Sequence, residues 1–390
     1  MKEIRLKGVS HTNVGGKLRI QADVSGAQSL WFELNMEYQH LVDTESADAF
    51  FVLYTWLAME QGCDLIVEGA VSKRLVDSIN NKVKTMFLTL CPELNDIQIT
   101  TIEAKKTWSN TVKAKITGFS GGVDSWYTAL KGEASEASFA SFLFTNVGQH
   151  GTENAQNTFV ERSKLAEKIV SPFNKPLINL HSNVDDCFKL QFQQRHTICN
   201  VACALLLQAG FSEFFYAAGF TANDSAIREH TDMAILDEFL LPLLSTERMV
   251  FLSSGGELGR IEKLEYISSI EKFSGHLYVC TEKGLPVKNC GHCFKCRRTQ
   301  LALHRLGLTD TLDKSFDIDH FYKIKTASMI GLVASSKANT SDLEIVEALE
   351  EKYGLRIIPI KIMSKLWLAI RAVLPESVKW RSMVNRPYLW

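Results

Sequence analysis

Residues 113–125, KAKITGFSGGVDS, are the stretch of sequence that decides the fold. The first seven residues, which end at Phe119, predict a strand, and residues 126–130 predict the start of a helix. A parallel strand that turns tightly into a helix leaves backbone N–H groups at the carboxyl edge of a sheet. Gly121 and Gly122 let the backbone wrap around an anion, because no Cβ atom stands in the way. The stretch therefore predicts a phosphate-binding loop.

The loop also carries polar side chains. Its two serines offer hydroxyl donors to phosphate oxygens, whereas the carboxylate of Asp124 repels phosphate unless Mg²⁺ is held beside it. The GxxxxGK(S/T) and GxGxxG patterns are absent, which excludes two common nucleotide loops. The alternative is a glycine-rich turn that merely begins a helix. We expect a phosphate group, together with Mg²⁺, to be bound by Ser120, Gly121, Gly122, Val123, Asp124 and Ser125.

Strands and helices alternate from about residue 111 onward. Alternation of this kind predicts an α/β fold with a doubly wound, mostly parallel sheet and helices on both of its faces. The helices are expected at about 153–169 and 189–209. The strands are expected at 113–119, 140–146, 176–182, 213–219 and 249–254.

Residues 1–110 predict a small α+β domain of their own. Apolar and polar residues alternate over 18–24 and 30–34, which indicates two half-buried strands. Asp43 or Thr44 could cap a helix that ends before Gly62. A strand at 64–69 and a helix at 72–90 follow. This domain could recognise the substrate or a partner.

The remaining domain boundaries follow from the motifs. We expect a nucleotide-binding domain over 111–310 and a helical extension over 311–390. The extension carries a run of acids that we interpret as a solvated helix face. These acids are Asp342, Glu344, Glu347, Glu350 and Glu351.

Four of the nine cysteines gather in residues 280–296, in the pattern C-x9-C-x2-C-x2-C. Two residues between cysteines let consecutive thiolates converge on one tetrahedral ion. Four thiolates close the coordination shell, so the site would be structural rather than catalytic. Zinc is the expected metal, and an iron–sulfur cluster is the main alternative. The expected ligands are Cys280, Cys290, Cys293 and Cys296.

Composition narrows the classes of function. The 390 residues include 43 Lys and Arg against 44 Asp and Glu, a net charge of −1, which argues against a nucleic-acid partner. No apolar run approaches the roughly 18 residues that a membrane span needs. The N-terminus has no apolar signal core, and the cysteine spacing is unlike a secreted disulfide framework. We therefore expect a cytoplasmic protein without a membrane partner.

The loop SGGVDS resembles the PP-loop of the N-type ATP pyrophosphatases, whose pattern is SGGxDS. Together with the cysteine pattern, it resembles the 7-cyano-7-deazaguanine synthase (QueC) family over residues 111–310, about half of the chain. That resemblance implies an ATP-dependent C–N ligase that adenylates 7-carboxy-7-deazaguanine or a similar carboxylate and releases pyrophosphate. Ammonia or an amine then displaces AMP.

The resemblance extends to residues between the two motifs. Gln149 and His150 resemble the family's polar turn after the second strand, and Lys263 resembles its lysine before the cysteine cluster. Lys263 could neutralise charge on the transferring phosphate, with a surface lysine as the alternative. Asp224 follows a strand and could contact Mg²⁺ or the substrate, with a helix cap as the alternative. The catalytic candidates are thus Asp124, Lys263 and Asp224. Arg195 and His196 are interpreted as a surface pair, with contact to a carboxylate as the alternative.

Extended relatives of this family occur in antiviral defence operons, where some attach a deazaguanine to the N-terminus of a partner protein. The resemblance therefore implies ATP, a small deazapurine-like carboxylate and a protein acceptor as partners, and a homodimer is compatible with it. Two other functions stay open. One is ATP-dependent tRNA thiolation, and the other is a nucleotide-sensing scaffold without catalysis.

Overall fold

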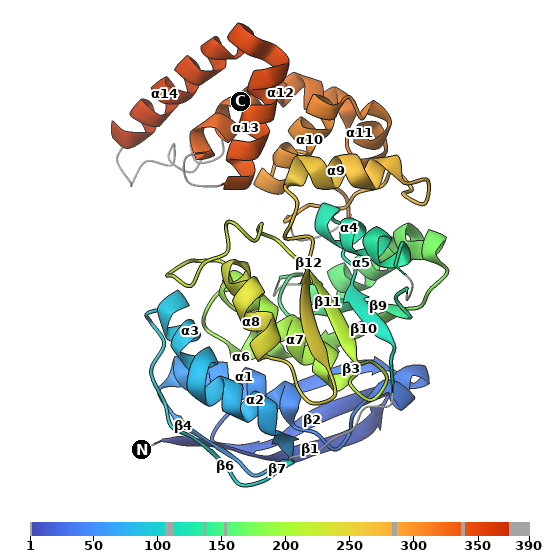
Figure 1. Cartoon of the computed structure of the whole chain (residues 1–390), viewed down its shortest axis with the longest axis vertical. Coiled ribbons are helices and arrows are strands. Elements are labelled where there is room, and N and C mark those ends of the chain that lie inside the picture. The colour runs from blue at the N-terminus through green and yellow to red at the C-terminus, as the bar shows by residue number, and fades with distance from the viewer. Residues whose placement is uncertain are drawn as a thin grey trace. The chain divides into compact units, whose positions relative to one another are not determined.

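The computed structural model describes residues 2–105, 112–135, 138–151, 154–282, 287–336 and 340–373 (Figure 1). The chain folds into two compact units. The first comprises residues 1–120 and 131–257, and the second comprises residues 121–130 and 258–390. The expected boundary between residues 110 and 111 lies outside the described residues. The functional division at 110 and 310 stays a prediction.

Ten strands of the described residues form one mixed sheet in the first unit, and most neighbouring strands are parallel. The expected α/β class with a mostly parallel sheet is therefore confirmed. The strands, in their order across the sheet, are β12 (Val250–Ser254), β11 (Glu213–Ala217), β8 (Lys115–Gly118), β9 (Ser141–Asn146), β10 (Leu177–Ser182), β3 (Trp31–Asn35), β2 (Lys17–Ser25), β1 (Glu3–Val14), β4 (Asp64–Val67) and β6 (Ile99–Thr101).

The chain order of the five strands from β8 to β12 is that of a doubly wound sheet. From β8 the chain adds β9 and β10 on one side, and it then returns to add β11 and β12 on the other. The sheet therefore changes winding direction between β8 and β11. In open α/β sheets, ligands bind beyond the carboxyl ends of the strands at such a switch point.

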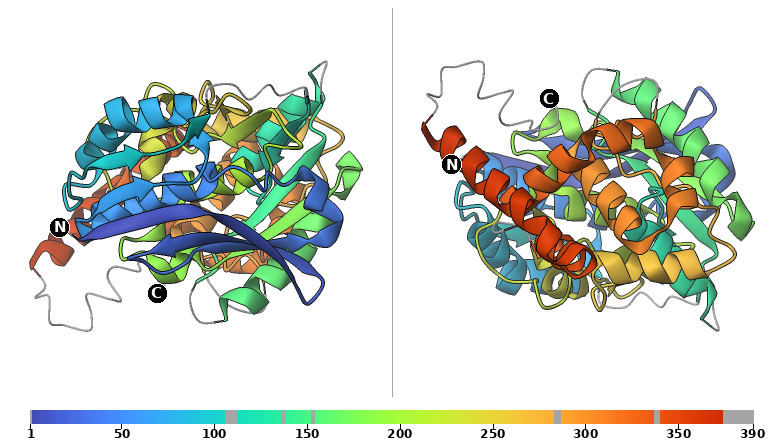
Figure 2. Two further views of the ribbon diagram at one scale, coloured as in Figure 1. Left: turned by 90° about the horizontal axis from the view of Figure 1, so that it is seen from below. Right: turned by 90° about the horizontal axis from the view of Figure 1, so that it is seen from above.

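The strands of residues 1–110 continue this sheet. β3 pairs antiparallel with β10, with His181 opposite Glu33, and the Trp31 backbone N–H donates to Asn183 Oδ1 at 2.8 Å. β1 and β2 form a long hairpin around Gly15 and Gly16, both with positive φ (Figure 2). β5 (Val71–Ser72) and β7 (Ala104–Lys105) form a separate short pair. Most of the N-terminal strands are thus part of the ten-stranded sheet of the first unit.

Helix α1 (Asp48–Gln61) is buried along almost its whole length and packs against α7 (His196–Leu206). The expected end before Gly62 is confirmed, because Gly62 closes the helix with a φ of 63°. The expected cap at Asp43 or Thr44 is wrong, because Ala47 takes that position. The Asp43 carboxylate instead accepts backbone N–H groups of residues 45 and 46 and pairs with Arg248 at 2.8 Å.

The other helices of the first unit follow the predicted alternation with shifted ends. α5 (Ala155–Val170) matches its expected range, and α7 begins seven residues later than the expected helix at 189–209. That delay has a local cause, because Gln191 and Gln194 cap a short 3₁₀ turn ahead of it. α2 (Lys73–Ser78), a π-helical turn (Ile79–Val83) and α3 (Lys84–Leu90) fill the expected helix at 72–90. α6 (Val184–Cys187) and α8 (Asp237–Leu243) complete this unit.

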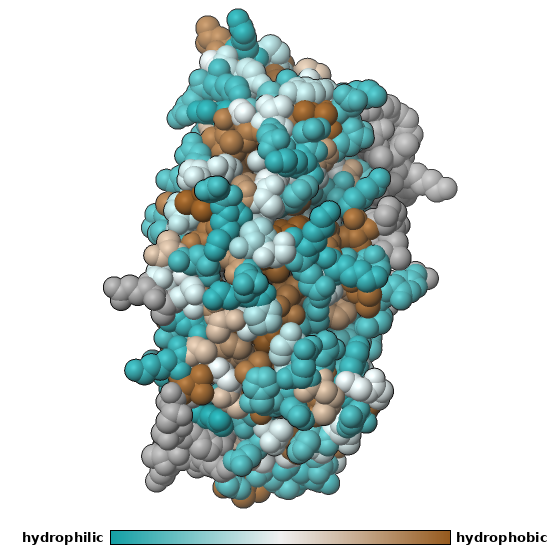
Figure 3. Space-filling model, turned by 90° about the vertical axis from the view of Figure 1, so that its right-hand side faces the viewer, coloured by the Kyte–Doolittle hydropathy of each residue, from teal (hydrophilic) through white to brown (hydrophobic). Residues whose placement is uncertain are grey.

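The second unit is helical in the part of the chain that the structure describes. It begins with the first residues of α4 (Val123–Glu133), whose Trp126 is buried and contacts Phe273 edge to face. Within the described residues, no helix is long and apolar enough to cross a membrane. Figure 3 shows hydrophobic residues interspersed among hydrophilic ones on one face of the molecule. The remaining helices are α9 (Arg260–Ser269), α10 (Phe294–Leu306), α11 (Thr309–Ser315), α12 (Ile318–Ser335), α13 (Thr340–Tyr353) and α14 (Ile358–Val373).

Candidate nucleotide and metal sites

The glycine-rich loop leaves the sheet at β8, the strand at the switch point, and runs into α4. Gly121 adopts a φ of +78°, a conformation that side chains disfavour, so the glycine is required by the backbone. Ser125 Oγ donates to the carbonyl of Gly122 at 2.9 Å, and the carbonyl of Gly121 accepts from Tyr278 N at 2.8 Å. The loop is therefore held in a defined, tight turn.

Asp124 and Lys263, two of the three catalytic candidates, lie together. Lys263 Nζ lies 3.0 Å from Asp124 Oδ1, and the lysine side chain is only 4% exposed. A lysine this deeply buried is paired rather than solvated, so the surface alternative is wrong for Lys263. Burial alone would raise the pKa of Asp124, but Arg260 and Lys263 outweigh it and lower the pKa to about 2. Asp124 is thus ionised throughout the physiological range.

Arg260 is a site residue that the sequence reasoning missed. It is the first residue of α9, and one of its terminal nitrogens lies 3.2 Å from Asp124 Oδ2. Its spacing from Lys263 was a usable signal, because residues three apart share one face of a helix. Lys295, which lies between Cys293 and Cys296 in the sequence, also lowers the pKa of Asp124. The loop carboxylate therefore lies in a cationic setting that suits an incoming polyphosphate.

The carboxylate of Asp124 is a suitable ligand for Mg²⁺, because proteins bind this ion through one or two carboxylates together with substrate phosphates. Asp224 is placed differently. It lies in the first unit, in the turn after β11, and its carboxylate accepts a hydrogen bond from Thr221 Oγ1 at 2.7 Å. The structure thus brings Asp124 together with Lys263, while Asp224 has a partner in its own turn.

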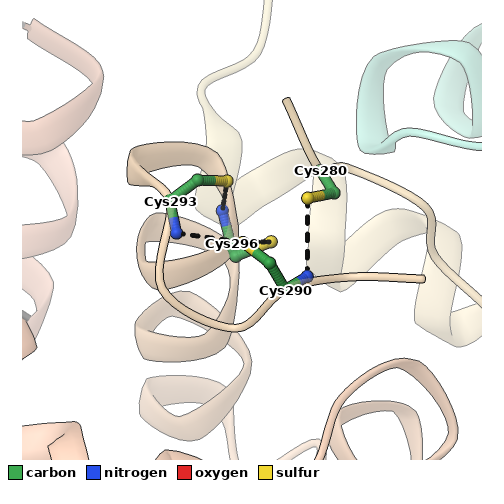
Figure 4. A group of neighbouring side chains, drawn as sticks. All are labelled: Cys280, Cys290, Cys293 and Cys296. Atoms are coloured by element: carbon green, nitrogen blue, oxygen red, sulfur yellow. Dashed lines mark hydrogen bonds between the residues drawn. The ribbon is translucent and has the colours of Figure 1, made fainter. Parts of the chain in front are cut away.

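The four clustered cysteines converge as the spacing predicted (Figure 4). Their Sγ atoms all lie within 4.8 Å of one another, and three of the four residues are buried. Cys280 Sγ accepts the backbone N–H of Cys290 at 3.4 Å, and Cys293 Sγ accepts that of Cys296 at 3.5 Å. The expected four-cysteine group that could hold a metal ion such as zinc is therefore confirmed.

The separation of the sulfurs favours one ion over a cluster. Four ligands at about 2.3 Å around a tetrahedral zinc lie about 3.8 Å apart. The Sγ atoms of Cys290 and Cys296 are 3.9 Å apart. An iron–sulfur cluster would spread its thiolates further, because they bind to different irons. Cys290 could also join Glu282 and His292 around an ion, but Glu282 is exposed.

A polar pocket of about 370 Å³ lies in the first unit, at the carboxyl ends of β9 and β10. Burial lowers the pKa of His181, which presents a neutral imidazole and shares a 2.9 Å hydrogen bond with Asn146. His150 contacts the same Asn146 side chain at 3.1 Å, so the Gln149–His150 turn supports the pocket wall. The lining residues are Asn146, Gly148, Gly151, Asn154, Ala155, Gln156, Asn157, His181, Ser182, Asp185 and Asp186.

The interpretation of Arg195 and His196 as a surface pair is wrong. Arg195 is 2% exposed and forms an ion pair with Asp185, which lines the pocket. His196 bridges Tyr216 and Asp232 through its two ring nitrogens, each at 2.9 Å. Arg195 precedes the buried apolar helix α7 and His196 is its first residue, and the polar groups of both side chains contact neighbouring segments. They belong to the polar network at the carboxyl edge of the sheet.

Comparison of the chain with protein-family models, with curated proteins and with solved structures finds no significant match. The resemblance to a family therefore rests on sequence motifs, above all the SGGVDS loop and the cysteine pattern.

Proposed function

We propose that this chain is an ATP-dependent C–N ligase of the PP-loop class, related to the 7-cyano-7-deazaguanine synthases, that forms AMP and pyrophosphate. The observation that carries the proposal is the loop Ser120–Ser125. It leaves the sheet at the switch point, and its Asp124 lies beside Arg260 and Lys263. A triphosphate needs such a backbone turn with nearby cations, because these groups neutralise the negative charge that develops on the phosphates in the transition state.

The proposed reaction has two steps. A substrate carboxylate oxygen attacks the α-phosphorus of ATP, the bond to the β-phosphate bridge breaks, and pyrophosphate leaves with its electron pair. Ammonia or an amine then attacks the acyl carbon of the adenylate, loses a proton and expels AMP. Mg²⁺ would neutralise charge on the phosphates, and Asp124 is the carboxylate placed to hold it. Arg260 and Lys263 would stabilise the negative charge on the leaving pyrophosphate.

The polar pocket supports a heterocyclic carboxylate as the substrate. It lies at the end of β9, which is the sheet neighbour of β8, the strand that leads into the loop. A neutral imidazole and carboxamide side chains offer both donors and acceptors to the edge of a planar ring. A deazapurine such as 7-carboxy-7-deazaguanine has such an edge. The amine acceptor would be ammonia or the N-terminus of a partner protein in a defence operon.

The four cysteines would hold one structural zinc ion per chain. Elemental analysis should find zinc in a one-to-one ratio, and Cys290→Ser should lose it. Iron with visible absorbance would refute the assignment.

The test of the function is carboxylate-dependent pyrophosphate release by the full chain. With ATP and 7-carboxy-7-deazaguanine, AMP and pyrophosphate should appear together, because the α-phosphorus is attacked. Asp124→Asn and Ser120→Ala should each lower the rate at least a hundredfold. Asp313→Asn, an exposed acid of the same unit, is the matched control and should stay at the wild-type rate. Release of ADP and phosphate would exclude the proposed chemistry, and no turnover with any carboxylate would favour the scaffold.

A further inference from the structure

Two acids of the C-terminal run are not on a solvated helix face. Asp342 on α13 is 6% exposed, and its carboxylate lies 2.6 Å from Arg298 Nε of α10. Glu344 also points into the second unit, toward α9. Glu347 and Glu351 are exposed, as the sequence predicted. The expectation of a solvated face is therefore wrong for the two acids in the first turns of α13.

The carboxylate of Glu344 caps the N-terminus of α9. Its two oxygens accept the backbone N–H groups of Arg260 at 2.8 Å and Ile261 at 2.6 Å. Glu262 accepts the N–H of Gly259 at 2.8 Å. A Cβ atom on Gly259 would lie 2.5 Å from a Glu344 oxygen, so only glycine leaves room for this approach. Three successive N–H groups at this helix end are thus satisfied by two carboxylates.

The first turn of α9, which Glu344 caps, also carries the two cations that contact the carboxylate of the loop. Arg260 and Lys263 lie on the first turn of α9, and both contact the carboxylate of Asp124. Glu344 therefore holds the backbone N–H of Arg260, whereas Asp124 holds its guanidinium group. A frayed first turn would release both cations, because the unsatisfied N–H groups of a helix end destabilise it.

We propose that Glu344 is a positioning residue of the nucleotide site: it fixes the first turn of α9 so that Arg260 and Lys263 face the loop. The helical extension, to which the motifs assign no chemistry, thereby becomes part of the catalytic unit. This inference rests on the proposed function, because the positioned cations act on ATP phosphates.

Because Glu344 is negatively charged, the direction in which ATP affinity changes on its replacement tests the proposal. A negative charge near the triphosphate would by itself weaken ATP binding, so its removal would tighten it if charge were all that mattered. Loss of positioning acts in the opposite direction, because misplaced cations no longer meet the phosphates. The direction of the change in ATP affinity therefore separates a positioning residue from an internal anion that competes with ATP.

The experiment compares Glu344→Ala, Glu344→Gln and the exposed control Glu347→Gln in the full chain. We expect Glu344→Ala to lower kcat roughly ten- to hundredfold and to raise the dissociation constant of ATP, measured by calorimetry. Glu344→Gln keeps one acceptor oxygen and should lie between this variant and the wild type. Glu347→Gln should be unchanged in both quantities. Zinc content and melting temperature report whether each variant is folded.

Several outcomes would overturn the inference. Rates within twofold of the wild type for Glu344→Ala, or for Glu344→Gln where the alanine variant does not fold, would show that α9 needs no such cap. Tighter ATP binding would identify Glu344 as a competing anion instead. These results leave the proposed function standing, because they require an active wild-type chain. A wild-type chain that neither binds ATP nor releases pyrophosphate would overturn the function and the inference together.

Discussion

At the scale of single residues, the site depends on one carboxylate and two cations. Asp124 comes from the loop, whereas Arg260 and Lys263 come from a helix that begins 136 residues further along the chain. The carboxylate is ionised because the cations outweigh the effect of burial. A triphosphate that enters this site would compete with Asp124 for the same two cations. The arrangement therefore holds Arg260 and Lys263 in place in the absence of the proposed nucleotide.

Replacement of Arg260 tests whether this cation belongs to the proposed nucleotide site. Arg260→Gln removes a fixed positive charge and should lower pyrophosphate release roughly tenfold or more, with a raised KM for ATP. The matched control is Lys314→Gln, which removes a cation from an exposed pair with Asp310 in the same unit. Steady-state kinetics with ATP as the varied substrate checks both. Equal KM values for the two variants would remove Arg260 from the nucleotide site.

Sequence reasoning found the residues whose signal is local. The SGGVDS loop and the C-x2-C-x2-C run are contiguous, so the chemistry of each could be inferred from its own spacing. Glu344 has no such signal, because its partners lie far away in the chain. Arg260 has only its spacing from Lys263 on the same helix, because its partner Asp124 lies far away in the chain. Arg195 was misjudged for the same reason, since a buried arginine is recognised only through the segments that surround it.

At the scale of elements, alternation predicted most strands of the sheet but missed β1 and the three-residue strand β6. In β1, Ile4 and Leu6 at its start are buried, but the residues after Leu6 are partly or fully exposed, so the apolar pattern fades along the strand. The joint between β3 and β10 could not be predicted either, because strand pairing across 150 residues depends on the whole fold rather than on a local pattern. The strands themselves could therefore be predicted more readily than which strands lie side by side in the sheet.

The start of α1 makes buried polar contacts with Ser72 and with Gln208, which follows α7, and these contacts should respond to pH. Asp48 at the start of α1 accepts hydrogen bonds from Ser72 N at 2.7 Å and from Gln208 Nε2 at 3.1 Å. Burial, the largest effect, raises the pKa of Asp48 from 3.8 to about 6. A carboxyl whose pKa is higher in the folded state binds its proton more tightly there. Its contribution to stability is therefore complete below pH 4 and is lost as the pH rises through 6.

The Asp48→Asn variant tests these contacts. A shift of about two pKa units corresponds to roughly 3 kcal/mol of unfolding free energy. The wild type should lose up to that amount between pH 4 and 7, and the variant should lack this part of the pH dependence. Urea unfolding of both proteins across this range measures the difference. Parallel pH profiles would show that Asp48 does not titrate in this range.

At the scale of the whole molecule, residues 1–110 are built into the first unit. β3 covers the edge of β10, and α1 packs its apolar side chains against α7, whose residues are almost all buried. An exposed strand edge and an uncovered apolar helix are both sites of aggregation. A role of these residues in recognising the substrate or a partner stays a proposal, but their structural role follows from these contacts.

Removal of residues 1–110 should therefore abolish folding of the sheet and not only substrate selection. The truncated chain would expose the β10 edge and apolar α7 residues such as Ile198 and Val201, which are fully buried in the full chain. We expect it to aggregate, or to unfold without a cooperative transition, in light scattering and thermal melts. The control is Trp31→Ala in the full chain, which removes one side chain from the joint and leaves β3 in place. A truncated chain that is monomeric, melts cooperatively and binds ATP would show that residues 111–390 fold on their own.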